Sequence, residues 1–147
     1  MTDIRPASRH DLDVLVPLFD AYRVFYKGSS NRDAARGFLG ARLSAGDSRI
    51  FLAFRNDRAV GFTQLYPSFS SVSMQRLWIL NDLYVDPEAR RTGTAKALMA
   101  AAEGFAREDG AKGLALATQI GNHAAQDLYA KMGYRKDEAF HHYFLTF

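Results

Sequence analysis

An apolar run, a short basic loop and an amphipathic stretch follow one another between Leu77 and Ala106, and this order constrains the fold more than any other feature. The apolar run covers residues 77–85. From Ala95 onward apolar residues recur at intervals of three and four, which predicts a helix with one buried face. The ten residues between are Asp-Pro-Glu-Ala-Arg-Arg-Thr-Gly-Thr-Ala. The segment therefore predicts strand, loop and helix, the unit from which α/β domains are built.

The loop has the properties of an anion-binding site. A helix N-terminus leaves backbone N–H groups unpaired and carries partial positive charge. Gly93 has no Cβ to block a ligand, and Arg90 and Arg91 add cationic charge. These features predict a site for a phosphorylated ligand. The plainer alternative is an ordinary strand-to-helix turn with solvated arginines. A nucleotide-binding module is disfavoured, because the G-x-G-x-x-G and G-x-x-x-x-G-K-[ST] patterns are absent.

Two motifs together resemble those of the GNAT family of N-acetyltransferases. Arg90-x-x-Gly93-x-Ala95 resembles the family's pyrophosphate motif, [QR]-x-x-G-x-[GA]. Residues 122–134, Asn-His-Ala-Ala-Gln-Asp-Leu-Tyr-Ala-Lys-Met-Gly-Tyr, resemble its penultimate helix. The resemblance covers most of the chain. Residues 80–85 and 122–129 are most similar to the branch that acetylates polyamines, diamines and histone tails.

The expected fold is an α/β or α+β three-layer arrangement forming one N-acetyltransferase domain over residues 1–147. The resemblance implies a mixed sheet of six to seven strands with helices on both faces. Ser8 is a plausible helix cap, and Pro17 should kink or split the first helix. The other expected boundaries are strands 4–7, 50–54, 59–66, 77–85, 113–118 and 140–146, a helix over 33–44, and a surface turn over 67–71.

Composition limits the partners. The chain has 147 residues, 48% of them apolar, which suffices for a core. It has no cysteine, so disulfides, a thiol nucleophile and thiolate metal sites are excluded, and a cytoplasmic location is expected. No apolar run approaches the roughly 20 residues that span a bilayer, so no membrane partner is expected. The net charge of +3 fits a polyphosphate pocket and, without longer basic clusters, predicts no nucleic-acid binding.

The resemblance implies acetyl-CoA (coenzyme A) as cofactor. The loop amides from Arg91 to Lys96 are the candidate pyrophosphate donors, and backbone around Leu83 to Val85 would polarise the thioester carbonyl at a strand bulge. A regular strand is the alternative, although Asn81 and Asp82 are poor strand formers. The expected cofactor-binding residues are Leu83, Tyr84, Val85, Arg90, Arg91, Thr92, Gly93, Thr94, Ala95, Lys96, Asn122 and Tyr129.

Two side chains are candidates for catalysis. Asp82 can act as a base, directly or through water, as a charge anchor for a cationic substrate, or as a structural acceptor. Tyr129 lies on an apolar helix face, which alone favours a core tyrosine. By resemblance it is the acid that protonates the coenzyme A thiolate. Asn122 can cap its helix, and by resemblance it also bonds the pantetheine arm.

Aromatic side chains beside an acid suit an amine, which is apolar along its stem and cationic at its tip. Core packing or a dimer interface is the alternative for many of them. His141 and His142 lack a third ligand, so no metal site is expected. The expected substrate residues are Tyr22, Tyr26, Tyr66, Asn81, Asp82 and His142, with Phe25, Phe69, His141 and Tyr143 nearby.

These expectations combine into one function. The chain is predicted to be an acetyl-CoA-dependent N-acetyltransferase, acting by direct attack in a ternary complex on a small-molecule amine, a polyamine or diamine, or a lysine side chain. The alternative is a non-catalytic acyl-CoA-binding or regulatory domain on the same fold, against which the retained Tyr129 and Asp82 argue. The aromatic segment 140–147 predicts a homodimer that covers this edge.

Overall fold

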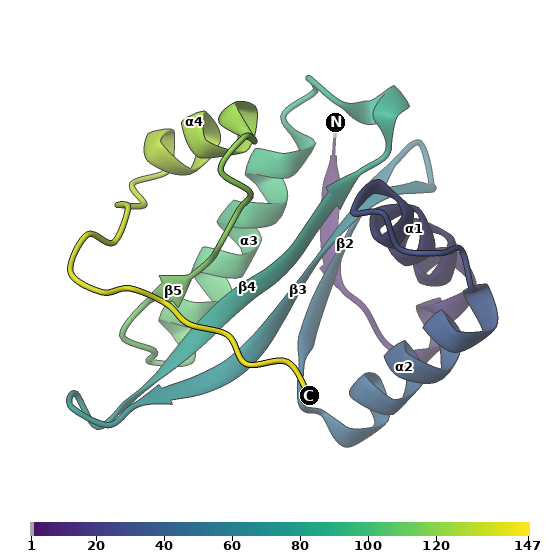
Figure 1. The fold of residues 1–147 in the computed structure, drawn as a ribbon. Helices are drawn as coiled ribbons and strands as arrows, with labels where there is room; N and C mark the ends of the chain where they lie inside the picture. The colour runs from purple at the N-terminus through teal and green to yellow at the C-terminus, as the bar shows by residue number, and fades with distance from the viewer. Residues whose placement is uncertain (1) are drawn as a thin grey trace. The chain divides into compact units, whose positions relative to one another are not determined.

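The computed structural model describes residues 2–147, and Figure 1 shows its helices and strands in chain order. By internal packing the chain divides into two compact units, of which the first ends at Ala117 and the second is Thr118–Phe147. In the described part of the chain, the first unit holds the sheet with helices α1, α2 and α3, and the second holds α4.

The sheet has five strands in the order β1-β2-β3-β4-β5. The neighbouring pairs are antiparallel except the last, in which β4 and β5 run parallel. The mixed α/β class is confirmed, but five strands replace the six to seven expected. The strands are β1 (Asp3–Pro6), β2 (Arg49–Arg55), β3 (Arg58–Ser70), β4 (Gln75–Val85) and β5 (Leu114–Ala115).

Two strand expectations and one turn expectation differ from the structure. The segment 140–146 forms no strand, and its side chains are exposed; its apolar residues alternate poorly, so it offers no single face to bury. The strand expected over 113–118 is only the two residues of β5. The expected turn at 67–71 is the end of β3, where Pro67 pairs with Trp78. Pro67 is tolerated because β2 pairs with β3 only as far as Leu65, so the missing N–H faces a free edge.

The hairpin between β2 and β3 lies where the sequence predicts two neighbouring strands. Arg55 pairs with Arg58, and Asn56 and Asp57 between them have φ of 49° and 62°. Positive φ at both central residues is the signature of the tight hairpin turn whose twist matches that of the strands.

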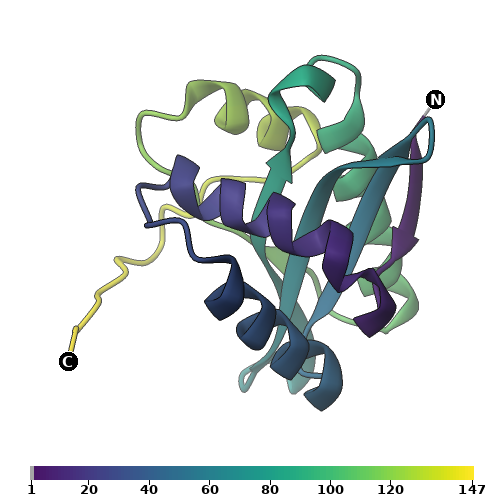
Figure 2. The same ribbon diagram turned by 90° about the vertical axis from the view of Figure 1, so that its right-hand side faces the viewer.

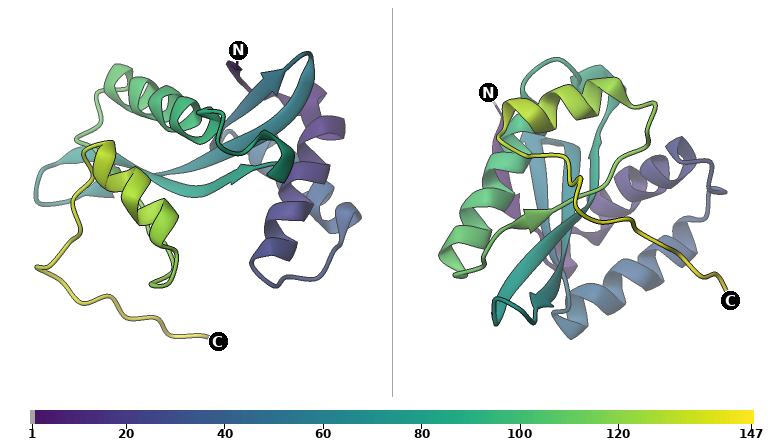
Figure 3. Two further views of the ribbon diagram at one scale, coloured as in Figure 1. Left: turned by 90° about the horizontal axis from the view of Figure 1, so that it is seen from above. Right: turned by 60° about the vertical axis from the view of Figure 1, so that its left-hand side comes forward.

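Helices cover both faces of the sheet. Helix α1 (Leu12–Phe25) packs on β3 and β4 with α2 (Arg32–Ala45) beside it, as Figure 2 shows. Helix α3 (Thr94–Glu108) packs on the other face, against β2, β3 and β4, which the view from above in Figure 3 makes clear. The core between α1, α2 and the sheet is made of Leu15, Val16, Leu18, Phe19, Ala35, Leu39, Ile50, Leu52 and Phe62.

The first helix starts as expected but is not divided at Pro17. Ser8 caps a short 3₁₀ turn, η1 (Arg9–Asp11), in a capping box with Asp11. Helix α1 then runs unbroken through Pro17. The proline removes one hydrogen bond, to the carbonyl of Asp13, and water can satisfy that carbonyl because Asp13 is exposed.

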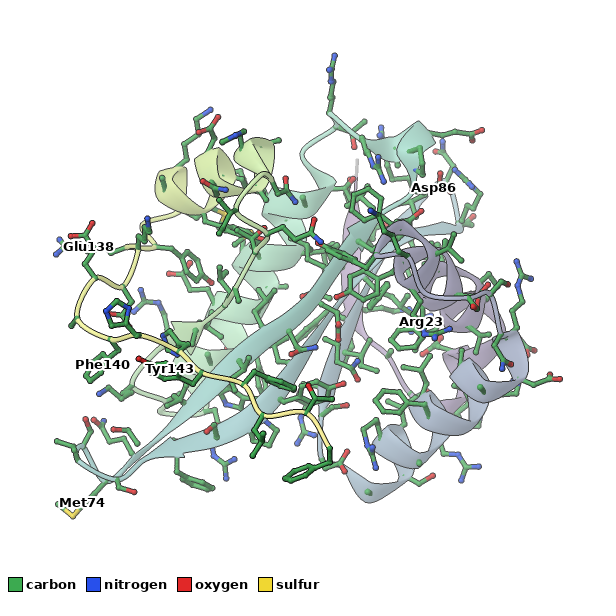
Figure 4. The ribbon with its side chains drawn as sticks, viewed as in Figure 1. Arg23, Met74, Asp86, Glu138, Phe140 and Tyr143 are labelled. Atoms are coloured by element: carbon green, nitrogen blue, oxygen red, sulfur yellow. The ribbon has the colours of Figure 1, made fainter. Side chains whose placement is uncertain are left out.

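The second unit contains one short helix, α4 (His123–Lys131), capped by the Asn122 side chain, which accepts a hydrogen bond from the Ala125 amide at 3.2 Å. Gly133 has φ of 93°, a left-handed conformation that ends the helix. Residues 135–147 have no regular structure. Phe140 and Tyr143 project from this segment in Figure 4.

Candidate active site

The centre of the candidate site is a change of register within β4. Gln64 of β3 faces Asp82, but the next residue, Leu65, faces Leu80, so Asn81 is the extra residue of a bulge. Asn81 is exposed and Asp82 is 5% exposed. The two poor strand formers therefore mark the irregularity, as the sequence indicated.

The bulge changes which amides of β4 face away from β3. Before it, the Trp78 N–H donates to Gly113 on the β5 side. After it, the Asp86 N–H donates to Val60 of β3, at 2.8 Å. Because N–H groups alternate along a strand, Leu83 and Val85 then face the β5 side. Pairing with β5 stops at Ile79, so these two amides lie beyond the ladder.

The carboxylate of Asp82 is held by neutral donors. Asn81 Nδ2 donates to Oδ1 at 3.0 Å, and Gln64 Nε2 donates to Oδ2 at 2.9 Å. The Tyr22 hydroxyl on α1 lies close to the same carboxylate. A carboxylate has about four lone-pair positions, so these two donors leave room for further partners.

The phenols around Asp82 stay protonated. Burial and the Asp82 charge raise the pKa of Tyr22 far above its usual value. Burial, then the same charge, raises the pKa of Tyr66 to about 12. Tyr22 also contacts the rings of Tyr26, Phe62 and Tyr84, with centroids 5.1, 5.7 and 6.4 Å away. The structure thus brings the expected substrate residues Tyr22, Tyr66 and Asp82 together.

The loop after β4 is built by its own side chains. Asp86 ends the strand at the opposite end from Met74 (Figure 4) and caps the turn η2 (Pro87–Ala89). Thr92 donates to the Ala89 carbonyl and bonds Thr94 at 2.8 Å. Thr94 is 1% exposed, so its side chain serves the loop rather than a ligand.

Gly93 is the N-cap of α3 and has φ of 81°, a conformation that favours glycine. A Cβ here would meet no protein atom within 4 Å, so the space over the backbone is open. The amides of Thr94, Ala95 and Lys96 have no acceptor within the helix. An anionic group such as a pyrophosphate fits this arrangement of open backbone and unpaired donors.

Arg90 and Arg91 differ in their surroundings. Arg90 Nε donates to the Val85 carbonyl at 3.0 Å, and its guanidinium lies 5.8 Å from the ring centroids of both Phe25 and Tyr84. Arg90 thereby ties the loop to β4 and α1. Arg91 is exposed and has φ of 63°.

The remaining predicted residues lie in the second unit. Tyr129 is partly buried on α4, and its ring centroid lies 6.1 Å from that of Tyr134. Asn122 is confirmed as the cap of this helix. His142 is exposed, with Nε2 3.6 Å from an Asp137 carboxylate oxygen.

Sequence reasoning missed two residues of β3. Thr63 donates to the Asp82 carbonyl at 2.8 Å, and Gln64 holds the carboxylate. The available signal was two adjacent polar residues inside the apolar strand 59–66. Both are fully buried.

A cavity of about 820 Å³ lies elsewhere and contains none of the predicted site residues. Arg9, His10, Arg49 and Glu108 are among its lining residues. Over residues 2–147 the structure shows no helix suited to crossing a bilayer and no cluster of three potential metal-binding side chains.

The fold and the candidate site define a class: an α/β protein with open backbone at a helix N-terminus, next to a strand whose last amides extend past the neighbouring strand. The chain belongs to the acetyltransferase (GNAT) family, whose model matches residues 15–134. It is an acetyltransferase enzyme, as its named homologues are.

Individual proteins similar to this chain are also named as acetyltransferases. An uncharacterised N-acetyltransferase of Bacillus subtilis (strain 168), YhfO, is 47% identical over 98% of this chain and 97% of its own length. The crystal structure of a probable acetyltransferase has 44% identity and a TM-score of 0.94, covering 99% of this chain and 97% of that one. An aminoglycoside N-acetyltransferase, AAC(6')-Iy, in complex with CoA shares the fold, with a TM-score of 0.83 at 22% identity over 99% and 95% of the two chains.

Proposed function

We propose that this enzyme transfers the acetyl group of acetyl-CoA to a primary amine. The observation that carries the proposal is the open end of β4: the Leu83 and Val85 amides lie beyond the ladder, next to the buried carboxylate of Asp82 and followed by the α3 N-terminus. Family membership and the CoA-bound relative of the same fold support the choice of cofactor.

Each element has a separate task. The amides of Thr94, Ala95 and Lys96, together with Arg91, bind the pyrophosphate. Acetyl-CoA supplies an activated acyl group as a thioester. The N–H groups of Leu83 and Val85 donate to the oxygen on which negative charge grows during attack. The substrate amine loses one proton to water and attacks in its neutral form, and the thiolate leaves as the new C–N bond forms. Tyr129 gives its proton to the departing sulfur, a role that rests on the family motif, and the second proton lost by the nitrogen returns Tyr129 to its neutral form through water.

Asp82 is proposed as the anchor for the substrate's charged amine. Its carboxylate is fixed by two neutral donors, Gln64 and Asn81, and lies beside phenols that stay protonated. A buried negative charge among aromatic rings recognises a cationic group with an apolar stem. A polyamine, diamine or lysine side chain fits this description, and so does an aminoglycoside amine. We further propose that the enzyme acts in the cytoplasm and that its chain forms one domain.

The test is acetyl transfer itself. The protein is incubated with acetyl-CoA and a panel of spermidine, cadaverine, an aminoglycoside and a lysine peptide, and thiol release is recorded. We expect acceptor-dependent release with at least one amine. Binding of acetyl-CoA by calorimetry without release on any amine would favour the non-catalytic acyl-CoA-binding alternative.

We also propose a homodimer. Phe140, Tyr143 and Phe144 are 72%, 91% and 92% exposed, so the segment 140–147 presents aromatic surface that a second copy can cover. Light scattering at micromolar concentration should give twice the mass of 16.4 kDa. Removal of residues 140–147 should give the monomer mass. A monomeric full-length chain would refute the proposal.

A further inference from the structure

Gln64 is buried at a cost that the fold does not explain. Its side chain is 0% exposed, and Nε2 donates to Asp82 Oδ2 at 2.9 Å. Its other amide atom, Oε1, is buried without a hydrogen-bond partner. A buried unpaired acceptor destabilises a folded chain, and an apolar side chain of the same shape would avoid it.

The direction of the amide shows what the glutamine does. Gln64 stands directly opposite Asp82, at the last pair before the bulge. Turning the amide over would place Oε1 against a carboxylate oxygen, with no proton between them. The observed orientation gives the carboxylate a donor and leaves the amide oxygen unpaired.

Gln64 and Asn81 reach the Asp82 carboxylate from two neighbouring strands. Asn81, the bulged residue of β4, donates to Oδ1 at 3.0 Å. Gln64, on β3, donates to Oδ2. One amide on each oxygen fixes the rotation of the carboxyl plane, which a single donor does not.

We propose that Gln64 is a positioning residue for amine recognition, holding the Asp82 carboxylate in the orientation that receives the substrate's charged nitrogen. The inference rests on the proposed function and adds a residue of β3 to it. Gln64 acts through Asp82 and does not touch the substrate, since its side chain is fully buried.

Two substitutions of similar shape separate this role from packing. Gln64→Met keeps an unbranched side chain and removes the donor. Gln64→Glu keeps the shape and replaces the donor by an acid. We expect Gln64→Met to raise the amine KM about tenfold, the weight of one hydrogen bond to a charged group, with the acetyl-CoA KM unchanged. Gln64→Glu should have the larger effect, because it places an acid beside Asp82.

A double-mutant cycle tests whether the effect passes through Asp82. In the Asp82→Asn background, Gln64→Met should change the amine KM by less than about twofold. Ser48→Ala is the matched control, because it also removes a buried unpartnered polar atom, away from the predicted site residues. It should leave both KM values unchanged.

The outcomes are distinct. Unchanged amine KM in Gln64→Met, or equal losses in both backgrounds, would overturn the positioning role while leaving the acetyltransferase function intact. A crystal structure of Gln64→Met gives a second readout that needs no turnover: the Asp82 carboxyl plane should rotate from its wild-type orientation. An unrotated carboxyl would overturn the inference. A rotated carboxyl in an enzyme that acetylates no amine would support positioning and refute the proposed function.

Discussion

The two halves of β4 differ in what lies beside them. In the first half, Trp78 and Ile79 pair with β5, and Trp78 Nε1 donates to Asp109 at 2.8 Å. In the second half, Leu83 and Val85 face the same side but extend past the end of β5. One inserted residue, Asn81, separates a half that completes the sheet from a half whose amides can serve a ligand.

The difference between the two halves shows where a β-sheet can bind a ligand through its backbone. Backbone donors in a regular ladder are already used, so a ligand can reach them only where pairing ends. The bulge also sets Asp82 opposite Gln64, on the face covered by α1. Substitutions in the open half and its loop should therefore affect catalysis, and those in the paired half should affect stability.

The largest effect is expected at the loop that follows the open half. Gly93→Glu places a side chain and a negative charge in the space over the α3 N-terminus. We expect no measurable coenzyme A binding by calorimetry. Gly46→Glu is the matched control, because Gly46 is also a left-handed helix cap with open space around it, φ 66°. Both variants place a side chain at a positive φ, so strain is common to the two, and only Gly93→Glu should lose the cofactor. Unchanged affinity in a folded Gly93→Glu variant would refute the site.

Tyr129→Phe should give the next largest effect. It removes only the hydroxyl, so the ring packing on Tyr134 is kept. Loss of the proton donor should lower kcat by about 10²-fold, with acetyl-CoA affinity unchanged. Tyr134→Phe, which removes the neighbouring hydroxyl, serves as the control and should keep its turnover. Wild-type turnover in Tyr129→Phe would leave water as the proton donor.

Asp82→Asn should act on the amine. It keeps the shape of the side chain and removes the charge, so the amine KM should rise about tenfold while kcat changes less. Steady-state kinetics with the best amine of the panel measure both. A fall in kcat with an unchanged KM would instead assign Asp82 the role of a base.

The smallest kinetic effect is expected in the paired half. Trp78→Phe removes the hydrogen bond to Asp109 and keeps an aromatic ring near Phe105, whose centroid is 4.9 Å away. Stability should fall by about 1 kcal/mol in urea unfolding, because one hydrogen bond is lost. Both KM values and kcat should stay at wild-type levels. A loss of kcat or a raised KM in Trp78→Phe would show that the paired half of β4 also contributes to catalysis.

Features that depend on neighbouring residues could be predicted from the sequence, and features that depend on contacts between distant residues could not. The loop, α3 and the β2–β3 hairpin follow from local patterns, such as the apolar spacing after Ala95 and the turn at Asn56 and Asp57. Asn81 and Asp82 indicated irregularity in β4 because they are poor strand formers. The role of Gln64 was hidden, because it depends on the pairing register with a strand 18 residues away. The segment 140–146 shows the reverse: its composition favoured a strand, but strand formation needs a partner that sequence composition does not supply.

The central claim, that the open half of β4 and the α3 N-terminus hold the cofactor through backbone amides, can be measured directly. In ¹⁵N-labelled protein titrated with acetyl-CoA, the amide signals of Leu83, Val85 and Thr94 to Lys96 should shift. The amides of Trp78 and Leu80, before the bulge, should hardly move. Shifts confined to the loop, or a uniform response along β4, would contradict the account.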